Sequence, residues 1–141
     1  MGKRRILGPT TLAIAAWIAW TTCAQAFDLT GLWATDEEAC GKIFATKAGK
    51  SSFQKDSDLH GGGFIVEGKR IRGRMATCNV RQTKEAGDTI HLMMACATDI
   101  MLQNIQFSVK FVDDNRIIRI FPGVEGMEMP YVRCPARPGG R

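Results

Sequence analysis

The sequence predicts an all-β fold, a small antiparallel meander of about seven or eight strands that closes into a barrel. Apolar and polar residues alternate with period two in several short segments, as in half-buried strands. Turn-forming residues separate these segments, and no long helical periodicity interrupts them. Closure into a barrel removes the exposed edges of an open meander, and a two-layer sandwich is the alternative.

Residues 1–26 have the three parts of a secretory signal peptide. A basic start at residues 3–5 is followed by an apolar stretch at 12–20 and an A-x-A site at 24–26. We therefore predict cleavage after Ala26, which places the mature protein in the periplasm or outside the cell. Contact with the membrane is then transient and made by the leader. An uncleaved anchor and lipidation at Cys23 are the alternatives.

Residues 27–141 are expected to form a single β domain with a flexible C-terminal tail from about residue 135. The full chain has 19 basic and 14 acidic residues, and three of the basic residues and none of the acidic ones lie in the leader. The mature chain therefore has a net charge of only +2. This balance gives no reason to expect a nucleic-acid partner.

Four of the five cysteines lie beyond the leader, namely Cys40, Cys78, Cys96 and Cys134. An even number of cysteines in a short exported chain predicts a disulfide framework. The chain has no C-x₂-C pair, so the sequence predicts no metal site, and it predicts no other cofactor.

The first strand is expected around residues 30–33, and a short helix is expected at 36–44. Asp36 is suited to accept a backbone hydrogen bond at the start of that helix. Residues 45–63 are predicted to be a loop that ends in His60-Gly61-Gly62-Gly63. This motif resembles an esterase oxyanion loop, but the G-x-S-x-G nucleophile motif is absent. We therefore expect a flexible loop that enters the strand at Phe64, and a close approach of the glycine backbone to another group is the alternative.

Residues 64–67 and 70–75 predict a hairpin, and residues 78–82 and 89–94 predict a second one around Gly87. If Glu85 pairs with Thr89, Cys78 lies opposite Cys96, which predicts that disulfide. Cys40 and Cys134 then form the second bridge. Residues 94–102 fit either a strand with a loop or a loop with a helical turn, and we favour the latter.

Residues 105–111 show the clearest strand alternation in the chain. Residues 113–115 form the next turn, 116–121 return as a strand, and 131–134 form the last strand. The apolar loop 122–129, together with 45–63, is expected to line the mouth of the barrel.

Thr30-Gly31-Leu32-Trp33 is similar to the start of lipocalin-like and avidin-like barrels, whose first strand opens with G-x-W. The resemblance implies that Trp33 closes one barrel end beneath an arginine from a late strand, either Arg119 or Arg133. Residues 95–102 and 131–135 also resemble segments of uncharacterised small exported bacterial proteins, a resemblance that implies no activity.

No group of residues predicts catalysis, so we expect a protein without enzymatic activity. We predict that it binds an envelope polymer or lipid, a protein partner or a small apolar ligand. The candidate binding residues are Trp33, Arg119, Arg133, Met127 and Met129. The alternative is a periplasmic inhibitor of a cell-wall hydrolase such as lysozyme, because residues 123–129 carry two acids and no Lys or Arg.

Overall fold

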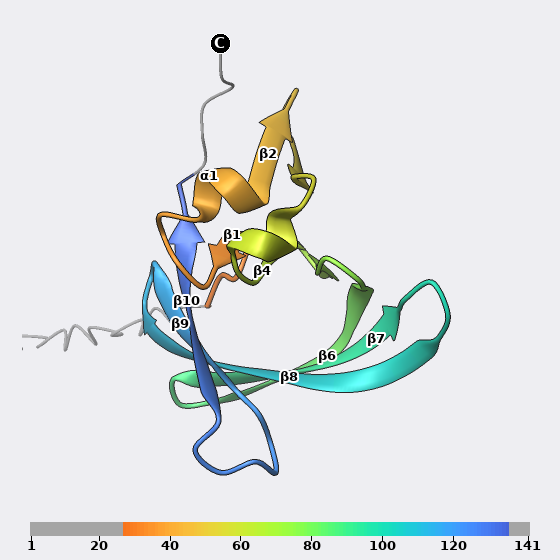
Figure 1. Cartoon of the computed structure of the whole chain (residues 1–141). Helices are drawn as coiled ribbons and strands as arrows, with labels where there is room; N and C mark the ends of the chain where they lie inside the picture. The colour runs from red at the N-terminus through yellow and green to blue at the C-terminus, as the bar shows by residue number, and fades with distance from the viewer. Residues whose placement is uncertain (1–26, 136–141) are drawn as a thin grey trace, which may run out of the picture.

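The computed structural model describes residues 27–135 and shows a closed barrel of eight antiparallel strands (Figure 1). The predicted all-β meander is confirmed, and it forms a barrel instead of a sandwich. The predicted leader, its cleavage site and most of the predicted C-terminal tail lie outside the described residues.

Each barrel strand pairs with the next barrel strand along the chain, and the last strand returns to the first. The barrel strands are β1 (Gly31–Ala34), β4 (Gly63–Glu67), β5 (Arg70–Arg72), β6 (Thr77–Ala86), β7 (Thr89–Ala97), β8 (Leu102–Asp113), β9 (Arg116–Ile120) and β10 (Glu128–Cys134). Between β1 and β4 lies an insertion that contains α1 (Cys40–Ile43), the hairpin of β2 (Phe44–Lys47) and β3 (Lys50–Phe53), and the 3₁₀ turn η1 (Ser57–His60).

Alternating side chains from the strands fill the interior of the barrel. Along β8, Phe107 and Val109 belong to the main core, as expected for one face of a strand. The main core comprises Leu29, Trp33, Phe64, Val66, Ile71, Cys78, Ile90, Leu92, Met94, Cys96, Phe107, Val109, Ile117 and Tyr131. The barrel therefore surrounds packed side chains along most of its length.

The insertion covers the outer face of β1, β4 and β10 and forms a second, smaller core with it. Ile43 and Phe44 of the insertion pack there with Ala34 and Ile65 from the barrel. The predicted helix is shorter than expected, because α1 is a single turn that begins at Cys40. Asp36 is not its N-cap; the Asp36 carboxylate accepts the N–H of Glu38 at 3.0 Å in the preceding turn.

Both predicted disulfides are present, Cys40–Cys134 and Cys78–Cys96. The register that predicted the second bridge was wrong near the turn, because Glu85 pairs with Ile90 and not with Thr89. A β-bulge between Val80 and Gln82 shifts the register by one residue and restores the Cys78–Cys96 pair. The helical turn favoured within residues 94–102 was also wrong, because β7 continues to Ala97.

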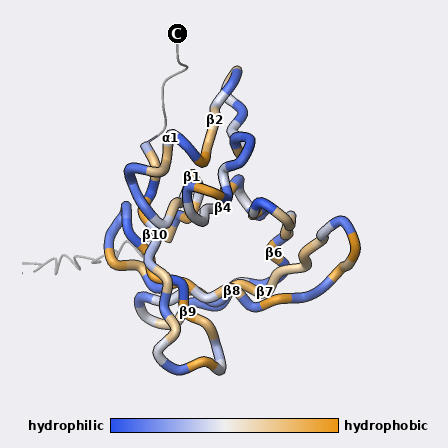
Figure 2. The backbone as a smooth tube through the Cα atoms, in the orientation of Figure 1, coloured by the Kyte–Doolittle hydropathy of each residue, from blue (hydrophilic) through white to orange (hydrophobic). Residues whose placement is uncertain are grey.

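The two ends of the barrel carry different connections. At one end, here called the polar end, residues 68–69, 87–88 and 114–115 connect the strands. At the other, the apolar end, the connections are 35–62, 73–76, 98–101 and 121–127. The apolar end holds the exposed side chains of Leu59, Met75, Ile100, Met101, Val124 and Met127. Figure 2 shows such hydrophobic residues on the turn between β7 and β8.

Candidate functional site

Trp33 and Arg133 meet at the polar end of the barrel. The Arg133 guanidinium carbon lies 4.3 Å from the centre of the Trp33 ring, which is fully buried. Of the two arginines proposed for this position, Arg133 therefore occupies it. Trp33 Nε1 donates a hydrogen bond to the carbonyl of Leu29 at 2.7 Å, which satisfies its polar atom inside the core.

The Arg133 guanidinium holds two other segments of the chain. Its Nη2 donates to the Asp28 carbonyl at 2.8 Å, its Nε donates to the Asp114 carbonyl at 2.9 Å, and its Nη1 donates to the carbonyl of Thr30. Hydrogen bonds from the backbone and side chain of Thr30 lower the pKa of Asp28. Trp33 and Arg133 thus hold residues 27–30, here called the N-terminal segment, across the polar end.

The N-terminal segment covers the polar end only in part. The ring of Phe27 stacks on that of Phe111 with 4.5 Å between the centroids, and Leu29 is buried. A groove of about 290 Å³ remains between this segment and residues of β4, β5, β6 and β7. Its lining includes Phe27, Leu29, Val80 and Ile90.

Arg119 faces inward from the part of β9 that lies nearer the apolar end of the barrel. It pairs across the sheet with Val109 on β8 and with Met129 on β10, and these partners belong to or pack against the main core. Cross-strand partners share one face of a sheet, so Arg119 points into the barrel. Its guanidinium lies 4.8 Å from the Phe107 ring centre and 4.5 Å from that of Phe121.

Three arginines of residues 27–135 are partly buried, and two of them have protein oxygens as acceptors. Arg72 donates to the Ser51 carbonyl at 2.7 Å and pairs with Glu67 at 2.9 Å. Arg133 donates to three carbonyls. Within the described part of the chain Arg119 has neither a hydrogen-bond acceptor nor an ion-pair partner. Its guanidinium instead lies over the rings of Phe107 and Phe121.

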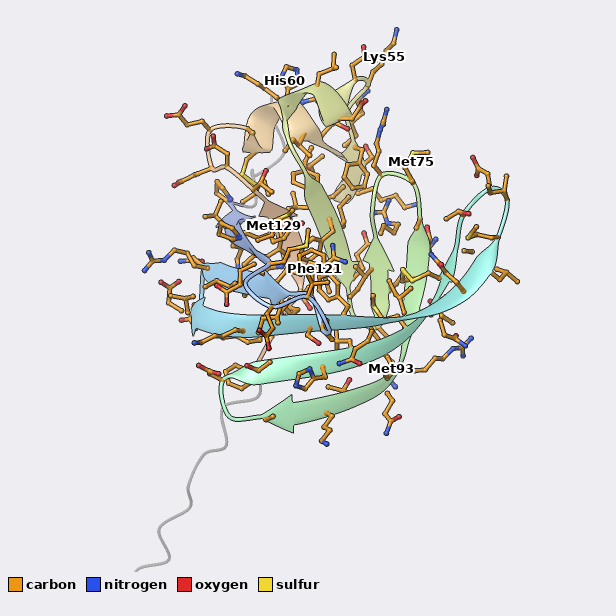
Figure 3. The ribbon with its side chains drawn as sticks, turned by 60° about the horizontal axis from the view of Figure 1, so that its bottom comes forward. Lys55, His60, Met75, Met93, Phe121 and Met129 are labelled. Carbon is orange, nitrogen blue, oxygen red and sulfur yellow. A yellow bond between two sulfur atoms is a disulfide. The ribbon has the colours of Figure 1, made fainter. Side chains whose placement is uncertain are left out.

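The two candidate methionines lie beside Arg119 and on the adjoining connection. Met129 packs against the core, and its sulfur accepts a hydrogen bond from the Tyr131 hydroxyl at 3.0 Å. Met127 is 47% exposed on the connection 121–127. Phe121 and Met129 lie on the same side of the barrel in Figure 3. The structure thus brings Arg119, Met127 and Met129 to one end and places Trp33 and Arg133 at the other.

Neither histidine has a carboxylate partner among residues 27–135. The Nδ1 atom of His91 lies 2.8 Å from the hydroxyl of Ser108. Ser108 belongs to the outer face of the sheet, but its neighbours cover it completely.

No group of three metal-binding side chains occurs in the described part of the chain. No helix there has the length and apolar character needed to span a membrane.

Comparisons with models of protein families, with curated proteins and with solved structures found no match. The candidate site therefore consists of what the geometry groups together: Arg119, Phe107, Phe121 and Met129. Sequence reasoning missed the two phenylalanines. The alternation of residues 105–111 already placed Phe107 inward, but the pairing of β8 with β9 was needed to place it near Arg119.

Proposed function

We propose that this chain is an exported binding protein that takes up a small amphiphilic carboxylic acid at the apolar end of its barrel. The two disulfides indicate an oxidising compartment, consistent with export. The single observation that carries the proposal is the inward-facing Arg119, which lacks an anionic partner among residues 27–135.

A guanidinium held against apolar groups favours an anion. Partial burial removes part of the water shell of Arg119, and the neighbouring rings of Phe107 and Phe121 offset this loss only in part. A carboxylate matches the paired N–H groups of a guanidinium and forms charge-assisted hydrogen bonds with it. Arg119 is therefore the proposed hydrogen-bond donor to the ligand head group.

The groups around Arg119 suit an apolar tail. Phe121 and Met129 lie beside the guanidinium, and the exposed Met127 extends the apolar surface outward. Methionine side chains adapt to ligands of irregular shape. The barrel interior is filled by its own side chains, so the tail is expected to lie along the mouth and not deep within the barrel.

Isothermal titration calorimetry of the mature chain with octanoate and with octanol tests this proposal. We expect octanoate to bind more tightly than octanol and Arg119→Gln to weaken octanoate binding by about tenfold or more, because a charge-assisted hydrogen bond is lost. The matched control is Arg116→Gln, on the same strand, where the arginine pairs with Asp113 at 2.7 Å at the surface. Arg116→Gln should leave octanoate binding unchanged.

Equal binding of octanoate and octanol would contradict the role of Arg119, as would equal losses in the two variants. Absence of octanoate binding at about 1 mM would reject the proposed ligand class. Circular dichroism and the mass of the oxidised protein should confirm that each variant is folded.

A second candidate function is inhibition of a basic cell-wall hydrolase by the connection 121–127. Val124 is 53% exposed there, and Glu125 is the only charged residue of that connection. An apolar, acidic tip fits a basic enzyme cleft through complementary charge. A large molar excess of the protein should slow cell-wall lysis by lysozyme, and Glu125→Lys should remove the effect. Undiminished lysis in the presence of the wild-type protein would exclude this candidate.

A further inference from the structure

We infer that the free edge of β8 at residues 102–106 pairs with the same edge of a second copy of this chain, which forms an antiparallel dimer. β8 pairs with β7 from Leu102 onward but with β9 only from Ser108 onward. The hairpin of β7 and β8 therefore extends beyond β9, as Figure 1 shows. This inference does not depend on ligand binding at Arg119.

The hydrogen-bond pattern shows which backbone groups face the free edge. The N–H of Phe111 donates to the Asp88 carbonyl at 2.8 Å, on the β7 side of β8. Every second residue of an antiparallel strand faces the same neighbour, and the register of β7 with β8 is regular back to Leu102. Leu102, Asn104 and Gln106 therefore direct their N–H and C=O groups outward, where no strand of residues 27–135 pairs with them.

The chemistry of this edge differs from that of the free edge of β6 in the same sheet. β6 also extends beyond its partner, because β5 pairs with it only at residues 77–79. The free part of β6 carries Arg81, Lys84 and Glu85, and charged side chains discourage pairing with another strand. Residues 102–106 read Leu-Gln-Asn-Ile-Gln and contain neither a charge nor a proline. The free edge of β8 therefore has no charge or proline that would discourage pairing with another strand.

The edge is complementary to itself. A two-fold axis at Asn104 places each Asn104 opposite the other and each Leu102 opposite Gln106 of the second copy, so no like charges meet. A strand added in this position continues the line of β9, which ends at Ile120 opposite Ser108. Leu102, which is 84% exposed, then faces Gln106 of the second copy on the outer face of the sheet.

Sedimentation velocity over a range of concentrations tests the dimer with the oxidised mature chain. We expect a concentration-dependent dimer that Asn104→Lys weakens by about tenfold or more, because two positive charges would then face each other across the axis. Asn104→Pro should act in the same direction, because it removes an outward N–H while leaving the bonds to β7 intact.

The matched control is Thr83→Pro on the charged edge of β6, which should leave dimerisation unchanged. A wild-type chain that stays monomeric at about 1 mM would overturn the inference. So would a dimer that Asn104→Lys leaves intact, or one that Thr83→Pro and Asn104→Pro weaken equally. The side chain of Asn104 is exposed on the outer face, so a lysine there does not disturb the core. If Asn104→Pro fails to fold, the result for Asn104→Lys therefore decides the question.

Discussion

At the scale of single residues, Gly63 shows how tightly the insertion is fitted to the barrel. A methyl group on Gly63 would lie 2.7 Å from the Trp33 carbonyl oxygen and 2.8 Å from Cζ of Phe44. The first of these atoms belongs to a backbone that is held in the sheet and cannot give way. The glycine therefore permits the close contact between β4, β1 and β2.

Gly63→Ala should lower the free energy of unfolding by about 2–3 kcal/mol, because it overpacks this contact. Gly62→Ala is the matched control, since its added methyl would lie 3.6 Å from Thr35, an ordinary contact. The control should change stability by about 0.5 kcal/mol or less. Urea unfolding followed by Trp33 fluorescence measures both values. Similar losses in the two variants would show that the contact at Gly63 is not tight.

At the scale of elements, Arg133 joins parts of the chain that are far apart in sequence. It extends from β10 to carbonyls of the N-terminal segment and of the turn between β8 and β9. Hydrogen bonds from one rigid guanidinium fix the relative position of these elements, which a lysine with its single charged group cannot do.

Arg133→Gln should destabilise the protein by about 2–3 kcal/mol, because it leaves carbonyls at the polar end without their donor. Arg116→Gln should cost much less, since the pair of Arg116 with Asp113 is exposed to solvent. Urea unfolding of both variants measures the difference. A loss for Arg133→Gln no larger than that for Arg116→Gln would contradict the fastening role of Arg133.

Local patterns predicted most of the strands, but not how they fit together. The Cys78–Cys96 bridge was predicted from a register that was wrong by one residue at the turn, and the bulge at Arg81 compensated for this error. A bulge depends on the curvature of the whole sheet and has no local sequence signal here. The β2–β3 hairpin was predicted as loop, because its polar outer face lacks a clear alternation.

The candidate site could be predicted only in part for a related reason. Arg119, Met127 and Met129 were among the candidate residues, but their common location follows from the pairing of β9 with β10. The resemblance to G-x-W barrels gave two candidates, Arg119 and Arg133, for the position over Trp33. Only the three-dimensional arrangement shows which of them lies there. Arg133 is next to Trp33 because β10 returns to pair with β1.

At the scale of the whole molecule, the two disulfides enclose segments of different length. Cys40 and Cys134 are 94 residues apart in sequence, whereas Cys78 and Cys96 are 18 apart. Closing the longer loop removes more conformational freedom from the unfolded chain. The longer bridge also connects the insertion to the last strand of the barrel.

Replacing both Cys40 and Cys134 by Ala should lower stability by about 4–5 kcal/mol, and replacing Cys78 and Cys96 should lower it by about 3 kcal/mol. Urea unfolding of the two double variants, compared with the oxidised wild type, measures this order. A larger loss from the shorter bridge would show that local packing and not loop length governs the contribution of each disulfide.

The Cys40–Cys134 bridge also makes nearly the entire barrel a covalent ring, with Cys78–Cys96 as a cross-link inside it. A protease that cuts once at the exposed connection 121–127 opens this ring without releasing a fragment. The nicked molecule keeps all its strands attached, and the cut becomes visible on a gel only after reduction. In an environment rich in proteases, such a molecule can survive a backbone break that would divide an uncrosslinked barrel in two.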